Sequence, residues 1–329
     1  MDPIGPVSLD AIRGARGRIA GVAVRTPLVR LEQETAGPES GIWLKLECLQ
    51  PIGSFKIRGA ANALALAGPA AIAYVVYTAS AGNMAQGVAL AARRAGVPCR
   101  VIVPDTAPRA KLDAIARLGG EIVPLPFDAW WATLREHGHP DESGFFIHPV
   151  SDPAVIAGNG TIGLEVADTL PEVDVVVVPY GGGGLSCGIA SALRRRAPQA
   201  RVYAAEVETA APFAASLEAG EPASVARRPT FVDGIGGSSL LTEMWPLASS
   251  LLAGSLVMSI EEICDAIRLL AGRAHVIAEG AGGAALAAAL ELQAREDPGR
   301  ERRIVAVVSG GNIDTDVLRA ILAGENPDA

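Results

Sequence analysis

The strongest constraint on the fold is a regular alternation of short apolar runs with longer, alanine-rich segments of helical period. Apolar runs of strand length are Ile42–Glu47, Ala71–Thr78, Arg100–Pro104, Glu121–Leu125, Val173–Pro179, Arg201–Ala205 and Arg303–Val308. Segments with a helical pattern include Asn83–Ala95, Pro108–Leu118, Pro153–Leu170, Leu185–Arg196 and Ile260–Arg273. Strands that alternate with helices form parallel sheets covered on both faces. The sequence therefore predicts an α/β protein with parallel sheets flanked by helices.

Glycine and small polar residues cluster where three of these strands end, at Ser80–Asn83, Gly181–Gly184 and Ser309–Asn312. Ligands bind beyond the carboxyl ends of the strands in open parallel sheets. Successive glycines before a helix expose backbone N–H groups beside the helix N-terminus, which favours a phosphate site. A close-packed turn is one alternative. A dinucleotide site is another, with Glu206 at the next strand end, although no register over Gly181–Gly188 completes GxGxxG.

A serine hydrolase is the alternative from a different class. Gly184-Leu185-Ser186-Cys187-Gly188 reads GxSxG between a strand and a helix, as a nucleophile elbow does. A catalytic histidine would have to follow the serine, and His275 is the only histidine after Ser186. No HGGG-type segment for an oxyanion hole is present.

Composition argues against several classes of function. The formal net charge of −8 disfavours nucleic acid as a partner, and no apolar run reaches the ~18 residues of a membrane span. The stretch Met1-Asp2-Pro3-Ile4 lacks the basic start and apolar run of a signal peptide. The scattered cysteines form no CxxC pair, so structural zinc and a disulfide framework are not expected: Cys48, Cys99, Cys187 and Cys264. We therefore expect a soluble, cytoplasmic protein that binds neither nucleic acid nor membranes.

Lysine is scarce in this chain. Of 28 lysine and arginine residues, only Lys45, Lys56 and Lys111 are lysines. Arginine cannot replace lysine where an amine must lose its proton and attack a carbonyl. Each remaining lysine is therefore a candidate for chemistry.

The segment around Lys56 carries a family resemblance. Ser54-Phe55-Lys56-Ile57-Arg58-Gly59 resembles the lysine segment of fold type II pyridoxal 5'-phosphate enzymes, which are similar to the tryptophan synthase β chain. Ser80-Ala81-Gly82-Asn83, Gly181–Gly184 and Ser309-Gly310-Gly311-Asn312 resemble that family's asparagine, phosphate and ring-nitrogen motifs. Within the family, the chain is similar over nearly its whole length to threonine/serine dehydratases (ammonia-lyases) and serine racemases.

The resemblance implies roles for particular residues. Lys56 would bind the cofactor covalently and act as the base, while Phe55 would pack on the cofactor ring and Asn83 would bind its phenolic oxygen. The phosphate would bind backbone N–H groups of Gly181, Gly182, Gly183, Gly184 and Leu185. Ser309 would pair with the ring nitrogen, and Gly234 and Glu279 would line the cofactor pocket. The implied substrate-binding residues are Ser80, Ala81, Gly82, Asn83 and Met84.

The chain departs from this pattern at several positions. Serine racemases have a hydroxyl residue as a second base where this chain has Ala81, so racemisation should be weak or absent. Glu206 matches one ligand of the family's divalent-cation site, but Pro212 replaces the second, so no complete metal site is expected. Met84, Ile52 and the pair Trp130-Trp131 leave the substrate side chain open. We interpret the tryptophans as interface core or as a wall of the substrate pocket.

We expect a small domain over residues 70–148 and a large domain made of residues 1–69 and 149–329. The expected reaction is β-elimination (dehydration and deamination) of L-threonine, L-serine or both to a 2-oxo acid and ammonia. Alternatives are dehydration of 3-hydroxyaspartate, phenylserine or a hydroxyectoine-derived amino acid, and serine racemisation. The resemblance also implies a homodimer.

Overall fold

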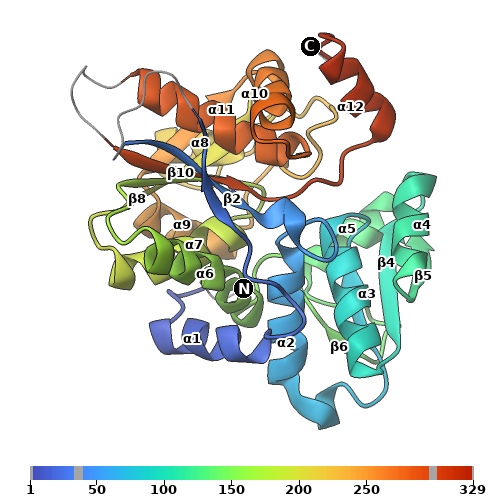
Figure 1. Cartoon of the computed structure of the whole chain (residues 1–329). Helices are drawn as coiled ribbons and strands as arrows, with labels where there is room; N and C mark the ends of the chain where they lie inside the picture. The colour runs from blue at the N-terminus through green and yellow to red at the C-terminus, as the bar shows by residue number, and fades with distance from the viewer. Residues whose placement is uncertain (1–2, 33–39, 296–301, 328–329) are drawn as a thin grey trace.

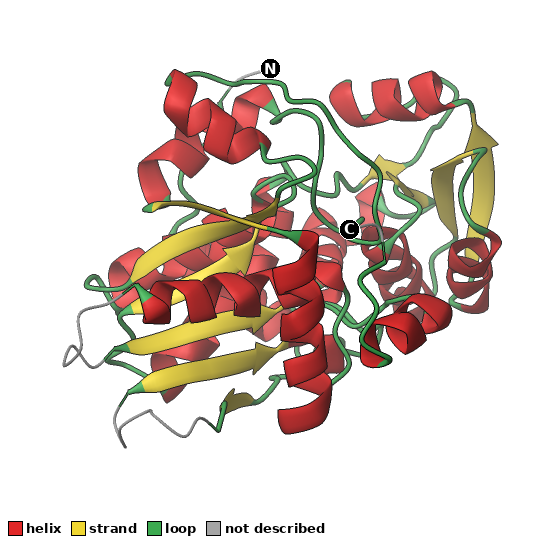
Figure 2. Cartoon of the chain, turned by 90° about the horizontal axis from the view of Figure 1, so that it is seen from above, coloured by secondary structure: helices red, strands yellow, loops and turns green. Residues whose placement is uncertain are grey.

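The chain folds into two sheets with helices on their faces (Figures 1 and 2). The computed structural model describes residues 3–32, 40–295 and 302–327. Met1 and Asp2, which belong to the N-terminal stretch considered above, lie outside the described residues. All the strands described pair in parallel except β1, which is antiparallel to β2. The prediction of an α/β fold with parallel sheets flanked by helices is confirmed.

The six-stranded sheet combines strands from the N-terminal part of the chain with strands from its C-terminal half. Its strands, from edge to edge, are β1 (Leu28–Arg30), β2 (Gly41–Leu46), β10 (Arg303–Val308), β7 (Val175–Pro179), β8 (Arg201–Val207) and β9 (Gly254–Met258). The order places β10 between β2 and β7, so the turns that follow these three parallel strands lie side by side at their carboxyl ends.

The four-stranded sheet is built from a continuous part of the chain. Its strands, from edge to edge, are β5 (Gly120–Leu125), β4 (Cys99–Pro104), β3 (Val76–Ala79) and β6 (Phe145–Phe146).

The helices lie on both sides of these sheets. In chain order they are α1 (Leu9–Arg18), α2 (Lys56–Ala71), α3 (Asn83–Ala95), α4 (Arg109–Arg117), α5 (Phe127–Arg135), α6 (Pro153–Thr169), α7 (Gly184–Arg196), α8 (Pro212–Ala219), α9 (Trp245–Leu251), α10 (Ile260–Arg273), α11 (Gly280–Ala294) and α12 (Thr315–Leu322). Two short 3₁₀ helices are η1 (Glu47–Leu49) and η2 (Thr242–Met244). No helix in the described part is long and apolar enough to cross a membrane.

One predicted strand is too long at its start. Residues 71–78 were expected to be extended, but Ala71 ends helix α2 and β3 begins only at Val76. The non-helical backbone of Gly68, with φ of +76° and ψ of 167°, divides this segment into two helices. The second helix contains Pro69 and reaches Ala71, so this alanine is helical rather than extended. Strands β1, β6 and β9 were not predicted, because they are short or carry few buried residues.

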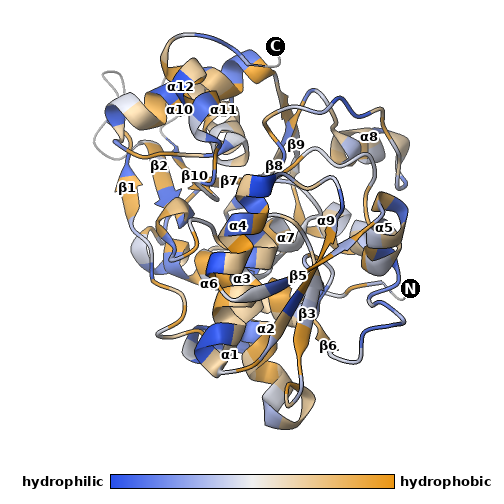
Figure 3. Cartoon of the chain, turned by 90° about the vertical axis from the view of Figure 1, so that its right-hand side faces the viewer, coloured by the Kyte–Doolittle hydropathy of each residue, from blue (hydrophilic) through white to orange (hydrophobic). Residues whose placement is uncertain are grey.

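Alternate residues of the central strands pack into two different hydrophobic cores, one on each face of the sheet. Val175 and Val177 of β7 pack with α10 and α11 on one face, and Val176 and Val178 pack with α6, α7 and α9 on the other. A strand covered on both faces needs apolar residues at every position, which explains the continuous valine run. Figure 3 shows hydrophobic residues along the strands, with hydrophilic ones on outer helices such as α1, α4 and α10.

Candidate active site

Lys56 is the first residue of α2 and lies where the loop after β2 turns back toward the sheet. Its Nζ atom donates a hydrogen bond to the backbone oxygen of Pro149 at 2.9 Å and lies 5.3 Å from the centroid of the Phe55 ring. Burial lowers the pKa of Lys56 to about 8, and the negative charge of Glu279 opposes this shift. An amine with such a pKa is partly unprotonated near neutral pH, as a nucleophile or base must be.

The Ser309–Asn312 turn lies directly against the lysine loop. Strands β2 and β10 are parallel neighbours, so the turns that follow them meet. The backbone N–H of Phe55 donates to the backbone carbonyl oxygen of Ser309 at 3.0 Å. The backbone N–H of Gly311 donates to the backbone carbonyl oxygen of Gly53 at 2.8 Å. Ser309 is buried at this junction.

The glycine loop Gly181–Gly184 connects β7 to the N-terminus of α7 and packs against Val150. A Cβ atom on Gly182 would lie 2.6 Å from a Val150 methyl group, and one on Gly184 would lie 2.8 Å from the Val150 oxygen. Gly183 has φ of +90°, which favours glycine. Leu185, in the first turn of α7, is buried. Because Val150 follows Pro149, this loop lies beside the residue that binds the Lys56 amine.

Asn83, the first residue of α3, joins the two sheets through its side chain. Its amide nitrogen donates to both carboxylate oxygens of Glu279, at 2.9 and 3.1 Å. Its amide oxygen accepts from Asn312 at 2.7 Å, and Asn312 also donates to the Ile52 oxygen at 2.9 Å. Burial raises the pKa of Glu279 to about 7, and the bond from Asn83 opposes that shift.

Gly234 faces the glycine loop from the other side. A Cβ atom on Gly181 would lie 3.2 Å from the Gly234 oxygen. The preceding residue, Asp233, forms an ion pair with Lys111 of α4. Lys111 therefore connects the loop at Gly234 to a helix beside the four-stranded sheet.

The turn after β3 leaves Ser80, Ala81 and Gly82 partly exposed. The Gly82 N–H donates to the Ser80 hydroxyl at 3.2 Å. Met84 differs, because it is 1% exposed and packs in the same hydrophobic core as Ile52. Its side chain therefore faces the protein interior.

Glu206, the residue matched to a metal ligand, is held by donors of the protein itself. Its carboxylate accepts from the N–H groups of Phe213 and Ala214 at 2.9 and 2.7 Å and from the Ser255 hydroxyl at 2.6 Å. Burial raises the pKa of Glu206, and these bonds oppose the shift. Pro212 is the first residue of α8, so the helix N-terminus occupies the place of the missing second ligand. Among the described residues, no cluster of three or more His, Cys, Asp or Glu side chains could hold a metal ion.

Ser186 does not have the geometry of a nucleophile. Its side chain is fully buried in α7, and its hydroxyl donates to the Gly183 oxygen at 3.1 Å. His275 is exposed in the segment between α10 and α11. The geometry therefore gives no support to the hydrolase alternative.

Trp130 and Trp131 lie on α5. The Trp130 ring centroid is 5.5 Å from that of Phe127 and 6.1 Å from that of Trp131. Trp130 packs against a small core that includes Tyr77 and Leu134, and Trp131 is 37% exposed. Trp130 thus belongs to the core beside the four-stranded sheet, and a pocket role for Trp131 stays a prediction.

Two features near Lys56 were missed by the sequence analysis. The Pro149 carbonyl has no side-chain signature and could not be found. The second feature is a buried ionic cluster, in which Arg58 donates to Glu47 at 2.8 Å and to Glu165 at 2.7 Å, and Lys45 donates to Glu165 at 2.5 Å. A lysine inside the apolar run of β2 was the available signal for this cluster.

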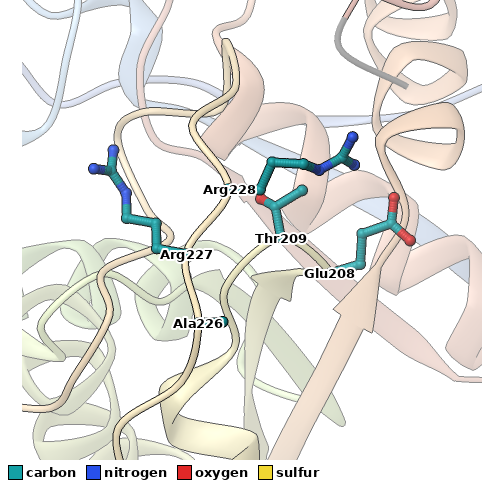
Figure 4. Close-up of a pocket in the computed structure, with 5 residues that line it drawn as sticks. All are labelled: Glu208, Thr209, Ala226, Arg227 and Arg228. Atoms are coloured by element: carbon teal, nitrogen blue, oxygen red, sulfur yellow. The ribbon is translucent and has the colours of Figure 1, made fainter.

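A cavity of about 410 Å³ lies elsewhere, past the end of β8 (Figure 4). It is lined by Glu208, Thr209, Ala226, Arg227 and Arg228. None of the residues predicted for the site lines it. We assign the site from the strand ends rather than from this hollow.

Comparisons with known proteins show the family of the chain. The family model described as "Pyridoxal-phosphate dependent enzyme" matches residues 19–310. The L-threonine ammonia-lyase of Thermotoga maritima is 38% identical, over 96% of this chain and 78% of that protein. The catabolic L-threonine dehydratase of Escherichia coli K12 is 38% identical, over 94% of both chains. The structure of maize serine racemase superposes with a TM-score of 0.85 at 31% identity, covering 97% of this chain and 98% of that one.

The chain therefore belongs to the family of pyridoxal-phosphate-dependent enzymes. Its parallel sheets and its structural relatives place it in fold type II of that family. The residues present fit the cofactor on their own geometry. Lys56 is half-buried and offers an amine of lowered pKa, and the glycine loop offers backbone N–H groups at the start of α7, where a side chain would clash.

Proposed function

We propose that this enzyme is an L-threonine ammonia-lyase that also accepts L-serine. Water is eliminated from the Cα–H and Cβ–OH bonds, and the enamine released tautomerises and is hydrolysed to a 2-oxo acid and ammonia. The observation that carries the proposal is the Lys56 amine, whose pKa is lowered to about 8 and which lies beside the glycine loop. The relatives above that are named as an L-threonine ammonia-lyase and an L-threonine dehydratase support the choice of substrate.

The strand-end residues would hold the cofactor. Lys56 would bind it covalently, and the backbone N–H groups of Gly181–Leu185 would bind its phosphate. Phe55 would pack on the ring, Ser309 would pair with the ring nitrogen and Asn83 would bind the phenolic oxygen, beside Glu279 and Gly234. The cofactor, when bound, supplies an electron sink for negative charge at the substrate α-carbon.

The chain itself would bind the substrate and move protons. The N-terminus of α3 and the turn Ser80–Asn83 would bind the substrate carboxylate through N–H groups that lack helical partners. The unprotonated Lys56 amine would remove the α-proton. Met84 was assigned to the substrate site with this turn, but its burial gives that role no support.

Serine racemisation is the main alternative, because serine racemases share this fold. A racemase needs proton exchange on both faces of the α-carbon. Ala81 carries no group that transfers a proton, so we propose that racemisation is weak or absent. Production of D-serine at a rate comparable to 2-oxo acid release would contradict this.

The test is 2-oxo acid release by the purified holoenzyme on L-threonine, L-serine, 3-hydroxyaspartate and phenylserine. Lys56→Ala and Lys56→Arg are the matched variants, since arginine keeps the charge but not the reactive amine. Turnover of threonine or serine that both variants abolish supports the proposal. Turnover of only a larger or acidic substrate would move the function to a specialised dehydratase. A yellow protein that releases no 2-oxo acid from any of them would overturn the reaction proposed.

The assembly and location of the enzyme are also proposals. The strands of the four-stranded sheet all fall within residues 70–148, which supports a small domain there and a large one from 1–69 and 149–329. Closure of the small domain on substrate would exclude water from Lys56. We further infer a homodimer in the cytoplasm, measurable by light scattering and fractionation.

A further inference from the structure

A cluster of polar side chains lies next to the segment that binds Lys56. The rings of His137 and His148 are stacked, with centroids 4.1 Å apart and planes 9° apart. The Ser151 hydroxyl lies 3.1 Å from Nε2 of His137 and 3.1 Å from Nδ1 of His148. Nε2 of His137 also lies 3.5 Å from a carboxylate oxygen of Glu243, which is buried.

The backbone hydrogen bonds assign the acceptor nitrogen of His148. Nδ1 of His148 accepts from the N–H groups of Val150 and Ser151, at 3.1 and 2.8 Å, so it carries no hydrogen. With the Nε2–H tautomer of His137, the Ser151 hydroxyl accepts from His137 and turns its own hydrogen toward Nδ1 of His148, whose single lone pair also faces the two N–H groups. In that tautomer the same N–H group also faces the Glu243 carboxylate at 3.5 Å. Nε2 of His148 is buried and has no hydrogen-bond partner among the described residues.

This cluster connects the surroundings of both sheets. His137 follows α5 and His148 follows β6, beside the four-stranded sheet. Ser151 precedes α6, where Asp152 caps the helix, and Glu243 lies in η2. The hydrogen bond from His137 to Ser151 therefore ties the loop after α5 to the start of α6.

The segment between these contacts is the one that touches the site. Pro149, between His148 and Ser151, accepts the hydrogen bond from Lys56. Val150 is the residue against which Gly182 and Gly184 pack. Any shift of this segment would move both the lysine and the glycine loop.

His137 adopts a backbone conformation that side chains rarely adopt. Its φ is +55°, and His275 is the other non-glycine residue of the described chain with a positive φ, also +55°. Such a conformation persists where the surroundings impose it, and it is frequent at functional sites. His275 is exposed, whereas His137 is held by a stack and by polar contacts.

We propose that His137 is a positioning residue for Lys56. Through Ser151 and His148 it fixes the segment 148–151 and thereby the Pro149 carbonyl that holds the amine. The proposal rests on the proposed function in one respect, that Lys56 is the reactive amine. His137 itself takes no part in proton transfer.

Three variants separate the contacts. His137→Phe keeps a ring for stacking and removes the polar atom, while His137→Gln keeps an N–H donor near the position of Nε2. Ser151→Ala removes the hydroxyl with little change in volume and serves if the His137 variants fold poorly. His275→Phe is the matched control, with the same residue type and φ away from these contacts.

The first readout is steady-state kinetics of the holoenzymes. We expect kcat of His137→Phe and Ser151→Ala to fall about tenfold or more with KM nearly unchanged, because a misplaced reactive group slows the chemical step. His137→Gln should recover most of the lost rate, and His275→Phe should match the wild type.

The second readout uses the apoprotein and needs no turnover. Acetylation of Lys56 is followed by mass spectrometry against pH, with Lys111 as an internal reference. The wild-type midpoint should lie near the pKa of about 8, and in His137→Phe and Ser151→Ala it should rise as the freed amine reaches water. Unchanged kcat and midpoint in both folded variants would overturn the proposal, as would equal changes in His275→Phe. A wild-type protein without turnover would refute the proposed function and leave this second readout intact.

Discussion

Lys45 and Lys56 are close in sequence, but Lys45 is buried and Lys56 is half-buried, and the groups around the two amines differ in kind. The Lys45 amine is 2.5 Å from a Glu165 oxygen and 3.7 Å from a Glu47 oxygen, and with Arg58 these side chains form a cluster without net charge. Lys56 has a neutral carbonyl as its hydrogen-bond acceptor. Burial lowers the pKa of both amines, but only at Lys45 do carboxylates in direct contact oppose it.

The difference shows how the neighbouring groups distinguish a lysine with a structural role from a lysine with a reactive amine. A carboxylate in contact favours the charged form of an ammonium and opposes the effect of burial. A carbonyl in contact orients the amine without fixing its charge, so the amine can lose its proton near neutral pH. Two lysines only eleven positions apart, at 45 and 56, thus have different roles: Lys45 belongs to an ionic cluster and Lys56 to the candidate site.

Replacing each of the two lysines with arginine should show the difference between them most clearly. Lys56→Arg should lower 2-oxo acid release by about a thousandfold or more, because no other group replaces the amine. Lys45→Arg should keep most of the activity and lose about 1–3 kcal/mol of stability through overpacking. The measurements are steady-state kinetics and urea unfolding of both variants. Comparable activity in the two would refute the distinction.

Removing the charge at Lys45 should destabilise the fold. Lys45→Met leaves Glu47 and Glu165 facing Arg58 alone and should cost about 3–5 kcal/mol in the free energy of unfolding. The double variant Lys45→Met with Glu165→Gln restores neutrality and should recover part of that loss. Urea unfolding measures both. A single variant as stable as the wild type would show that the cluster is not tightly coupled.

A methyl group added to the glycine loop, which lies beside the segment that binds Lys56, should weaken cofactor binding. The added Cβ in Gly184→Ala would lie 2.8 Å from the Val150 oxygen, so the loop must shift. We expect cofactor affinity to fall about tenfold. Gly17→Ala, in α1 with no atom within 4 Å of the added Cβ, is the control and should leave affinity unchanged. Titration of the apoproteins with cofactor, followed by absorbance, gives both values.

The pH dependence of stability should reveal the carboxyl near Lys56. Burial raises the pKa of Glu279 from 4.5 to about 7, so the folded apoprotein holds this proton more tightly than the unfolded chain does. Its contribution is fully present below the unfolded pKa and is lost as pH rises through about 7. Glu279→Gln should therefore lose less stability than the wild type between these pH values. Parallel stability curves for the two proteins would contradict the shift.

Chelation of metal ions should have the smallest effect. Glu206 is satisfied by two N–H groups of α8 and the Ser255 hydroxyl, without a cation. We expect EDTA or added Mg²⁺ to leave both the melting temperature and kcat unchanged. A rise in melting temperature with Mg²⁺ that is absent in Glu206→Gln would show that a cation competes with these donors.

The sequence predicted the central strands and the long helices because their residues repeat with the right period. The valines of β7 and the apolar faces of α3 and α10 are buried as the pattern indicated, and the predicted bounds of these two helices match the structure. The strand order of the sheets could not be predicted, because period says which face is buried and not which strand is the neighbour. The start of β3 was wrong because a short apolar run does not show where a strand begins, and Ala71 at the start of this run ends a helix.

The candidate site divides in the same way. Motifs with glycine, serine and lysine at strand ends indicated the residues that come together, since the carboxyl ends of parallel strands meet at one edge. Contacts made by backbone atoms, such as the Pro149 carbonyl, leave no trace in residue type. The stack of His137 on His148 was missed as well, because the sequence separates the two rings and only the fold joins them.

The central claim is that Lys56 alone, of three lysines, carries the cofactor. The most direct measurement is reduction of the cofactor-loaded enzyme with borohydride, followed by peptide mapping with mass spectrometry. The account predicts one cofactor adduct per chain, on the peptide that contains Lys56, and none on Lys45 or Lys111. An adduct on either of the other lysines, or no adduct in a protein that still releases 2-oxo acid, would contradict it.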